Sequence, residues 1–275
     1  MSLIKRPPIL DSTGQKIASA IRSSSQNILT IRDNSAYHNS IFRGEALGNE
    51  ITSAQKQAIK NGTFENLFIG DYWTINGVNW RIAHFNYWLG TGDDDNICTS
   101  NHIVIVPDTN LATAKMNSSN STAGGYLGSG LYTGINLDET GNTGLSTAKA
   151  TFVNAFGQKH LLKHRELFSN AVTNGTVSGT IWVDSIVDLM SERMVYGTPV
   201  WGKSGYEAGI DKTILALFDL NPEFIQKQRS WYWLRPVGSA AGFCRVGTYG
   251  YAVNGGASDS VGVRPAAAIY FDDVE

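Results

Sequence analysis

The residues with catalytic or metal-binding potential form no complete set in this sequence. His160 and His164 stand four residues apart, which would place two imidazole rings on one helix face, but Leu161 occupies the position of the catalytic Glu in an HExxH motif. Asp93-Asp94-Asp95 could offer oxygen ligands to Ca²⁺, but lacks the alternating acidic residues and the later Glu of an EF-hand loop. We expect a solvated acidic turn, and neither a metal nor a cofactor.

The sequence also lacks the motifs that nucleophilic catalysis and phosphoryl transfer require. Gly202-Lys203-Ser204-Gly205 does not have the GxSxG spacing of a nucleophile elbow. His164-Arg165-Glu166 places Glu where a kinase catalytic loop has Asp, and no glycine-rich phosphate loop precedes it. Glycoside hydrolysis stays open, because its two carboxylates are brought together in space rather than in sequence. The sequence favours a protein that is not an enzyme, with a glycoside hydrolase as the alternative.

Composition indicates a fold rich in sheets and loops. Charged residues make up 17% of the 275 residues, while aromatic residues reach 11% and glycines number 29. The formal net charge is −2, and no basic run supplies the phosphate contacts that nucleic-acid binding needs. Nucleic acid is therefore not an expected partner.

Membrane insertion and a zinc site are not expected either. No stretch of about 18 apolar residues is present, and residues 1–10 lack the apolar core of a signal peptide. Cys98 and Cys244 are too few for a zinc site, and we expect two thiols buried as small apolar side chains rather than a disulfide.

The start of the chain predicts a short amphipathic helix. Ile17, Ala20 and Ile21 recur at helical spacing after Pro7-Pro8, and the pattern ends at Ser23-Ser24-Ser25. A helix this short needs to dock on something, and docking on its own domain or on a partner are both open. We divide the chain into an N-terminal docking segment, 1–40, and one domain, 41–275.

The next elements are a capped helix and a hairpin. Thr52-Ser53-Ala54-Gln55 is a capping-box pattern that predicts a helix over residues 53–61. Strands over Leu67–Ile75 and Val78–Tyr87 are joined by Asn76-Gly77, a pair that suits a type I′ turn. We expect Trp73 and Trp80, beside that turn, to form a core platform rather than a ligand-stacking surface.

The middle of the chain predicts one strand, one long loop and two helices. His102–Val106 has the pattern of a buried strand, and Met116–Gly144 that of a long surface loop. Gly144–Phe156 and Asp184–Tyr196 have helical spacing, each followed by a glycine. After these, short strand-like runs alternate with glycine-containing turns: Trp231–Pro236, Gly242–Thr248, Tyr251–Val253 and Gly262–Phe271.

Two motifs near the end carry a family resemblance. Trp231-Tyr232-Trp233-Leu234-Arg235 and Gly262-Val263-Arg264-Pro265-Ala266 resemble the W-W-L-R and G-V-R-P-A signature of phage and prophage proteins with a C-type-lectin-like fold. The resemblance covers roughly residues 42–271 and includes Gly70–Arg81 and His102–Asp108. It implies an α+β fold, C-type-lectin-like and sheet-rich, with short helices and long loops.

The resemblance also implies a place and a role. It points to a virion structural protein of tailed phages that infect Gram-positive hosts such as clostridia, on the virion surface as a capsid decoration protein or on the tail. Residues 1–40 would contact other virion proteins (major capsid or tail proteins), and the lectin-like domain would bind a host-surface glycan or protein. A homo-oligomer in the particle is expected. A purely shell-stabilising decoration protein is the alternative, and a cell-wall glycoside hydrolase is the less favoured one.

The segment between the two motifs is the candidate ligand surface, since the corresponding stretch faces the ligand in lectin-like display proteins of phages. Its Tyr, Ser and Asn content suits recognition, although its aromatic residues could instead fill the core. Calcium-dependent sugar binding is not implied, because the Glu-Pro-Asn, Gln-Pro-Asp and Trp-Asn-Asp motifs are absent. We expect structural roles for Trp231, Trp233, Arg235, Arg264, Trp73 and Trp80. The candidate ligand-binding residues are Phe243, Arg245, Tyr249, Tyr251, Asn254, Ser258 and Asp259.

Overall fold

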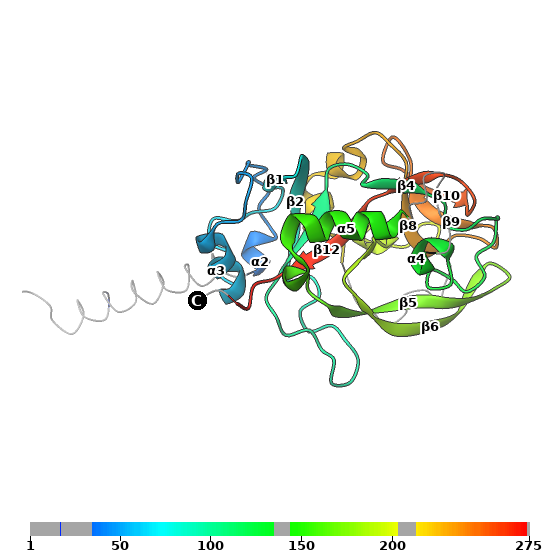
Figure 1. Cartoon of the computed structure of the whole chain (residues 1–275), viewed down its shortest axis with the longest axis horizontal. Helices are drawn as coiled ribbons and strands as arrows, with labels where there is room; N and C mark the ends of the chain where they lie inside the picture. Colours follow the sequence, from blue (N-terminus) through cyan, green and yellow to red (C-terminus); the bar gives the residue numbers. More distant parts are fainter. Residues whose placement is uncertain (1–16, 18–34, 135–143, 203–212, 274–275) are drawn as a thin grey trace, which may run out of the picture.

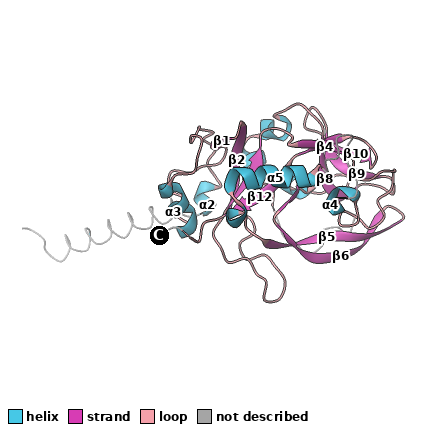
Figure 2. Ribbon diagram, in the orientation of Figure 1, coloured by secondary structure: helices cyan, strands magenta, loops and turns pink. Residues whose placement is uncertain are grey.

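The computed structural model describes residue 17 and residues 35–134, 144–202 and 213–273. Within these residues, two five-stranded sheets and a separate two-stranded hairpin form the body of the protein, with short helices around them (Figures 1 and 2). This arrangement confirms a sheet-rich α+β class. Apart from Ile17, which is exposed and helical, the predicted N-terminal helix lies outside the described residues.

The last residues of the predicted docking segment pack on the domain. Helix α2 (Ser35–His38) places the buried ring of His38 with Nδ1 2.7 Å from the carbonyl oxygen of Leu67. The Asn39 side chain accepts a hydrogen bond from the backbone N–H of Phe85 at 2.8 Å and donates one to its carbonyl oxygen at 3.0 Å. The folded domain therefore includes residues 35–40, and it starts earlier than the boundary expected at residue 41.

The first sheet joins strands from distant parts of the chain. The strand order is β1 (Tyr72–Ile75), β2 (Val78–Phe85), β3 (Ile103–Pro107), β12 (Pro265–Ile269) and β7 (Val187–Leu189). Strand β12 lies between β3 and β7 and runs antiparallel to both. A strand near the end of the chain therefore belongs to the same sheet as the predicted hairpin.

The predicted hairpin and its aromatic pair are confirmed. Asn76 and Gly77 have φ angles of 54° and 77°, as a type I′ turn requires. Trp73 lies directly opposite Trp80, and both side chains are fully buried. The ring of Trp80 packs edge-on against Phe152, with 4.6 Å between the ring centres. The two tryptophans are core residues.

The second sheet contains most of the first resemblance motif and the start of the second. Strand β8 carries the first motif, and β11 pairs parallel to it with Gly262 opposite Tyr232. The predicted run Gly262–Phe271 is divided at Arg264, because β11 and β12 belong to different sheets. The strand order is β10 (Ala252–Gly256), β9 (Gly242–Val246), β8 (Tyr232–Val237), β11 (Val261–Val263) and β4 (Ala112–Ala114).

The sequence interpretation was wrong between residues 164 and 196. Strands β5 (His164–Thr173) and β6 (Thr176–Ser185) form a long hairpin, and the predicted helix Asp184–Tyr196 begins inside β6. Strand β7 follows because its backbone groups pair with β12. Only α6 (Glu192–Tyr196) is helical, capped by Ser191 and ended by Gly197. The spacing of the apolar residues was compatible with a helix. Residues 187–189 form a strand instead, because their backbone pairs with β12.

The glycines in the turns of the β5–β6 and β1–β2 hairpins allow a matched comparison of two substitutions. Gly175 and Gly77 have φ angles of 74° and 77°, but a Cβ on Gly175 would lie 2.5 Å from the Ala240 backbone nitrogen, whereas one on Gly77 meets nothing within 4 Å. We expect Gly77→Ala to lower the free energy of unfolding by about 1 kcal/mol and Gly175→Ala by about 1–3 kcal/mol more. Denaturant unfolding measures both, and equal losses would contradict the close approach.

Two predicted helices are confirmed. Helix α3 (Ser53–Asn61) starts with the capping box of Thr52 and Gln55 and ends at Gly62 in the left-handed conformation. Helix α5 (Leu145–Phe156) buries Ala148, Phe152 and Phe156, as its spacing predicted. The remaining short helices are α4 (Gly130–Thr133), η1 (Gln158–His160), α7 (Ala216–Leu220) and η2 (Pro222–Gln226).

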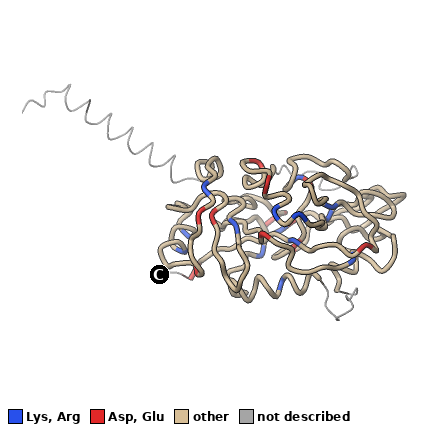
Figure 3. Tube along the Cα trace, turned by 90° about the horizontal axis from the view of Figure 1, so that it is seen from above, with Lys and Arg blue, Asp and Glu red and all other residues tan. Residues whose placement is uncertain are grey.

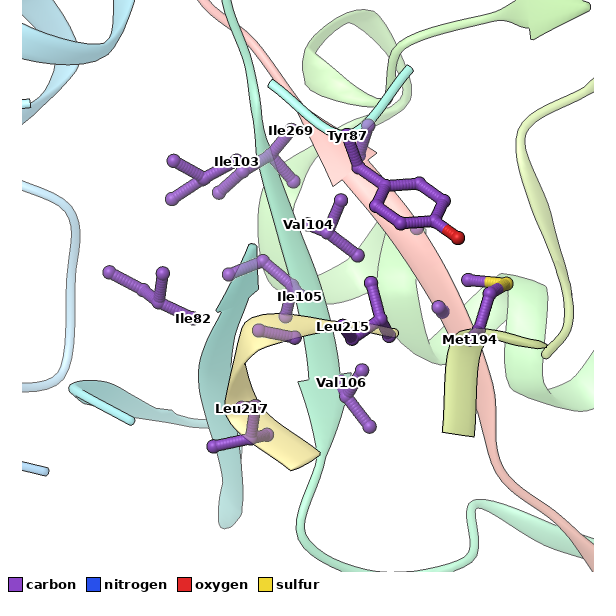
Figure 4. Packing of buried hydrophobic residues seen from close by; sticks show 14 of the residues in the cluster. Ile82, Tyr87, Ile103, Val104, Ile105, Val106, Met194, Leu215, Leu217 and Ile269 are labelled. Carbon is purple, nitrogen blue, oxygen red and sulfur yellow. The ribbon is translucent and has the colours of Figure 1, made fainter. Parts of the chain in front are cut away.

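The hydrophobic core draws on both sheets and on segments expected at the surface. Figure 4 shows aliphatic side chains of β3 packed with Leu215 and Leu217 from the start of α7 and with Met194 from α6. The segment Met116–Gly144 is not purely a surface loop, because Met116, Tyr126 and Leu131 are buried; residues 135–143 lie outside the described residues. Cys98 and Cys244 are both buried thiols, as expected.

Candidate binding surface

The candidate surface lies on one face of β8, β9 and β10, where the second core cluster ends. Phe243 and Arg245 are two residues apart in β9 and therefore share this face. Phe243 is fully buried and belongs to the same cluster as Trp233 and Val237. Its assignment as a ligand-facing residue was wrong, because the core covers this half of the face. Arg245, in the other half, is partly exposed.

The Arg245 guanidinium packs against two tryptophan rings. Its guanidinium carbon lies 4.3 Å from the ring centre of Trp231 and 5.8 Å from that of Trp233. Nη1 donates a hydrogen bond of 2.8 Å to the half-exposed carboxylate of Asp259. Gly255 on β10 leaves room for this side chain, since a Cβ there would lie 2.3 Å from the Arg245 side chain. Arg245 and Asp259 therefore form one oriented polar pair at the surface.

Two tyrosines extend the surface beyond Arg245. Tyr251 is 47% exposed, and its ring lies edge-on to Trp231 with 6.0 Å between ring centres. The same ring covers Gly247, where a Cβ would lie 2.6 Å away. Tyr249 is 74% exposed, in the turn that leads into β10. The alternative that Tyr249 and Tyr251 fill the core does not hold.

Trp201 is a component that the sequence interpretation missed. Its indole Nε1 donates a hydrogen bond of 3.2 Å to the carbonyl oxygen of Ala252, next to Tyr251 in β10. The side chain remains 45% exposed. The sequence carried only a weak signal, a lone Trp in a loop some 50 residues before β10. We call Trp201, Trp231, Arg245, Tyr249 and Tyr251 the aromatic surface.

A buried carboxylate fixes the loop that carries Trp201. Glu192 is fully buried and accepts hydrogen bonds from the backbone N–H groups of Val200 at 2.8 Å, Trp201 at 3.1 Å and Gly202 at 2.8 Å. Charge-assisted bonds of this kind are stronger than neutral ones. Glu192 is therefore a positioning residue for the exposed indole.

We expect Glu192→Gln to loosen this loop. An amide cannot accept three N–H groups as the carboxylate does, and its NH₂ group opposes one of them, so the free energy of unfolding should fall by about 2 kcal/mol. Hydrogen exchange of the amides of residues 200–202 should become about tenfold faster. The exposed Glu223 in η2 supplies the control, Glu223→Gln, which should leave both unchanged. Unaltered exchange in the Glu192 variant would show that the carboxylate does not hold the loop.

Two other candidate ligand residues are engaged within the protein. The Asn254 side chain donates a hydrogen bond of 3.0 Å to the hydroxyl of Ser239. The backbone N–H and the hydroxyl of Ser258 both donate to Asn120 Oδ1, at 3.0 and 2.8 Å. Both residues fix loops beside the surface. Arg245, Tyr249, Tyr251 and Asp259 are the candidates that combine exposure with a common location.

The arginines of the two motifs are structural, as expected. Arg264 is almost fully buried and donates to the carbonyl oxygens of Pro107 at 2.8 Å and Phe224 at 2.9 Å. Arg235 donates to the carbonyl oxygen of Leu189 at 3.1 Å and forms an ion pair of 2.7 Å with Glu166. Burial raises the pKa of Glu166, but the charge of Arg235 and the hydrogen bond with His164 prevail and bring it down to about 2.

The other buried carboxylates of the described residues also hold structural groups. Asp108 pairs with Arg81 at 2.6 Å. Asp188 accepts from the hydroxyls of Tyr126 at 3.0 Å and Ser185 at 2.7 Å, and its burial raises its pKa. Asp71 accepts from the Arg43 side chain at 2.7 Å and from the backbone N–H of Phe68 at 2.8 Å. Their partners account for these carboxylates without any substrate.

The remaining candidates for chemistry are placed as follows. His160 lies in η1 and His164 in β5, so the two rings do not share a helix face. Asp93 binds the guanidinium of Arg165 at 2.7 Å, so the acidic turn is tied to the β5–β6 hairpin at this residue. Among the described residues, no cluster of three or more His, Cys, Asp or Glu could hold a metal ion. Lys203, Ser204 and Gly205 lie outside the described residues.

The charge distribution offers no large field of one sign along the described trace. Figure 3 shows Lys and Arg interspersed with Asp and Glu. Of the helices in the described ranges, none has the length and apolar character needed to span a bilayer. In the comparisons with known proteins, no family model, no curated protein and no solved structure matches this chain.

Proposed function

We propose that this chain is a non-enzymatic structural protein of a bacteriophage virion whose aromatic surface binds a host-surface glycan or protein. One observation carries the binding part. All three aromatic side chains that the described residues expose, Trp201, Tyr249 and Tyr251, belong to the aromatic surface. Elsewhere the described aromatic rings are buried or partly buried, so this concentration favours recognition over chance exposure.

The chemistry of the surface suits a polar, ring-bearing ligand. Exposed Tyr and Trp side chains offer large rigid faces at a low cost in conformational entropy. The oriented pair of Arg245 and Asp259 adds charge-assisted hydrogen-bond donors and acceptors beside those faces. A sugar ring with its hydroxyl groups, or a polar protein loop, could use both features.

We further propose that the domain is C-type-lectin-like. The parallel pairing of β8 with β11 brings the two resemblance motifs together, and buried Arg235 and Arg264 support them from within. Strand β12, near the end of the chain, lies in the first sheet together with the β1–β2 hairpin. The calcium-binding motifs of sugar-binding members are absent, so the proposal concerns direct contact by side chains.

Attachment to the particle is assigned to residues 1–34, the part of the docking segment that precedes α2, with a capsid or tail protein as the partner. Immunogold labelling of purified particles should place the chain on the capsid surface or on the tail. Particles made with a chain that lacks residues 1–34 should lose the label. Normal incorporation of the shortened chain would refute the docking role, and unlabelled wild-type particles would refute the virion assignment.

The alternatives predict different results. Host adsorption that is unchanged without the protein, with particles that become less heat-resistant, would favour a shell-stabilising decoration protein. A clear zone on host peptidoglycan in zymography that persists through repeated purification would favour a cell-wall glycoside hydrolase. The structural partners of the buried carboxylates, from Arg235 on Glu166 to the three backbone N–H groups on Glu192, favour neither glycosidase role.

A further inference from the structure

Among the described residues, the β5–β6 hairpin is contacted by backbone groups at one edge and has no neighbouring strand at the other. On the β5 side, the backbone N–H of Leu127 donates to the carbonyl oxygen of Ser169 at 3.1 Å, and that of Tyr126 donates to the Ser169 hydroxyl at 3.0 Å. On the β6 side, the described residues supply no further strand, and the sheet ends at β6 (Figure 1). The carbonyl oxygen of Trp182 in β6 accepts a hydrogen bond of 3.1 Å from Arg165 Nη2. A strand that lacks a further neighbouring strand is a template for another one.

Strand β6 has little of the protection that edge strands usually carry. Residues 176–183 contain no charged residue and no proline, and Asp184 is the first charge. The pairing with β5 is regular from Thr180 to Ser185, and its irregularities lie on the turn side of Thr180. The outer edge therefore offers a regular, uncharged run centred near Ile181.

Ile181 is an apolar residue of β6 that the core leaves partly exposed. It lies directly opposite Phe168, which is 1% exposed, and directly opposed residues point to the same face. Ile181 itself is 47% exposed. A strand added beside β6 would cover this side chain and extend the apolar face by one strand.

We propose that β6 pairs antiparallel with β6 of a second copy of this chain, so that two hairpins form a continuous four-stranded sheet. The sequence of β6 is compatible with pairing to its own copy. A two-fold axis centred on Ile181 sets Asp184 opposite Ser178 and brings no like charges together. Such an axis is perpendicular to the sheet. The two Ile181 side chains therefore meet on one face and cover each other. This inference does not depend on the ligand of the aromatic surface.

The test compares two exposed isoleucines in the full chain. Ile181→Lys places two ammonium groups at the axis and should raise the dimer dissociation constant at least about tenfold. Ile97, 51% exposed and outside the hairpin, gives the matched control Ile97→Lys, which should dimerise like the wild type. Sedimentation equilibrium up to about 100 µM measures all three. A monomeric wild type, or unweakened dimerisation of Ile181→Lys, would overturn the proposal.

Cysteine cross-linking gives an independent readout that does not rely on loss of association. We expect Ile181→Cys to give a reducible dimer under mild oxidation, because a residue on the two-fold axis lies directly opposite its own copy. Wild type, whose Cys98 and Cys244 are buried, and Ile97→Cys should stay monomeric on denaturing gels. No cross-link in Ile181→Cys would contradict pairing at this edge about an axis at Ile181.

Discussion

Arg235→Met is expected to lower the free energy of unfolding by about 3–5 kcal/mol, because it leaves the buried carboxylate of Glu166 without its cation. Glu166 is 5% exposed, and the ion pair with Arg235 is 2.7 Å long. The guanidinium also lies 4.7 Å from the ring centre of Phe168 and donates to Leu189 in β7. A single side chain thus joins β8, the β5–β6 hairpin and the first sheet.

The matched control is Arg245→Met, in the same sheet. Arg245 pairs with a carboxylate at a similar distance, 2.8 Å, but Asp259 is 44% exposed in its side chain. Water can replace the lost partner there, so we expect a loss of about 1 kcal/mol or less. Urea denaturation of the two variants measures the difference. Equal losses would show that burial of the Glu166 pair does not determine its effect.

The same ion pair predicts a pH dependence of stability. The pKa of Glu166 is lowered from 4.5 to about 2 in the folded protein, against the effect of burial, mainly by the charge of Arg235. A lowered carboxylate pKa stabilises the fold above the unfolded pKa, and this contribution is lost as the pH falls through the folded pKa. The stability advantage of wild type over Glu166→Gln should therefore shrink between about pH 5 and pH 2.

The second large effect concerns binding. We expect the double variant Trp201→Ala/Tyr251→Ala to lose about 2 kcal/mol of binding free energy, or roughly 30-fold in affinity, because exposed aromatic side chains dominate the energy of such contacts. The Trp201 indole donates a hydrogen bond to the carbonyl oxygen of Ala252, the residue that follows Tyr251. Neither ring lies in the core. Folding should be retained, which circular dichroism and thermal unfolding check.

The control for this variant removes exposed apolar area elsewhere. Leu89 and Ile97 are 41% and 51% exposed and lie outside the aromatic surface. Leu89→Ala/Ile97→Ala should bind purified Gram-positive cell walls or an arrayed glycan as the wild type does. A similar loss in both double variants would indicate nonspecific adhesion rather than a defined surface.

Local sequence signals predicted much of the fold. The Asn76-Gly77 turn, the Thr52 capping box and the glycine stop of α5 depend on neighbouring residues, and each is confirmed. The β5–β6 hairpin was missed although Asn174-Gly175 has the same turn chemistry, with φ angles of 50° and 74°. The helix expected over 184–196 failed because the backbone of β7 pairs with β12, some 80 residues later.

The candidate site was predictable only in part. Alternation in β9 places Phe243 and Arg245 on one face, but it does not say that the core ends between them. That limit depends on Trp233 and Val237 of β8, which meet Phe243 in space. Trp201 reaches the site through a loop held by Glu192, and no periodic pattern links these residues.

The most direct test of the central claim is a binding measurement with the intact chain. Wild type and Trp201→Ala/Tyr251→Ala are titrated against purified cell walls of a Gram-positive bacterium and screened on a glycan array, with release of wall fragments monitored in parallel. We predict saturable binding by the wild type, a loss of about 30-fold in the variant and no released fragments. Equal binding by both proteins, no binding to any probe, or steady release of wall fragments would contradict a non-enzymatic binding protein that acts through the aromatic surface.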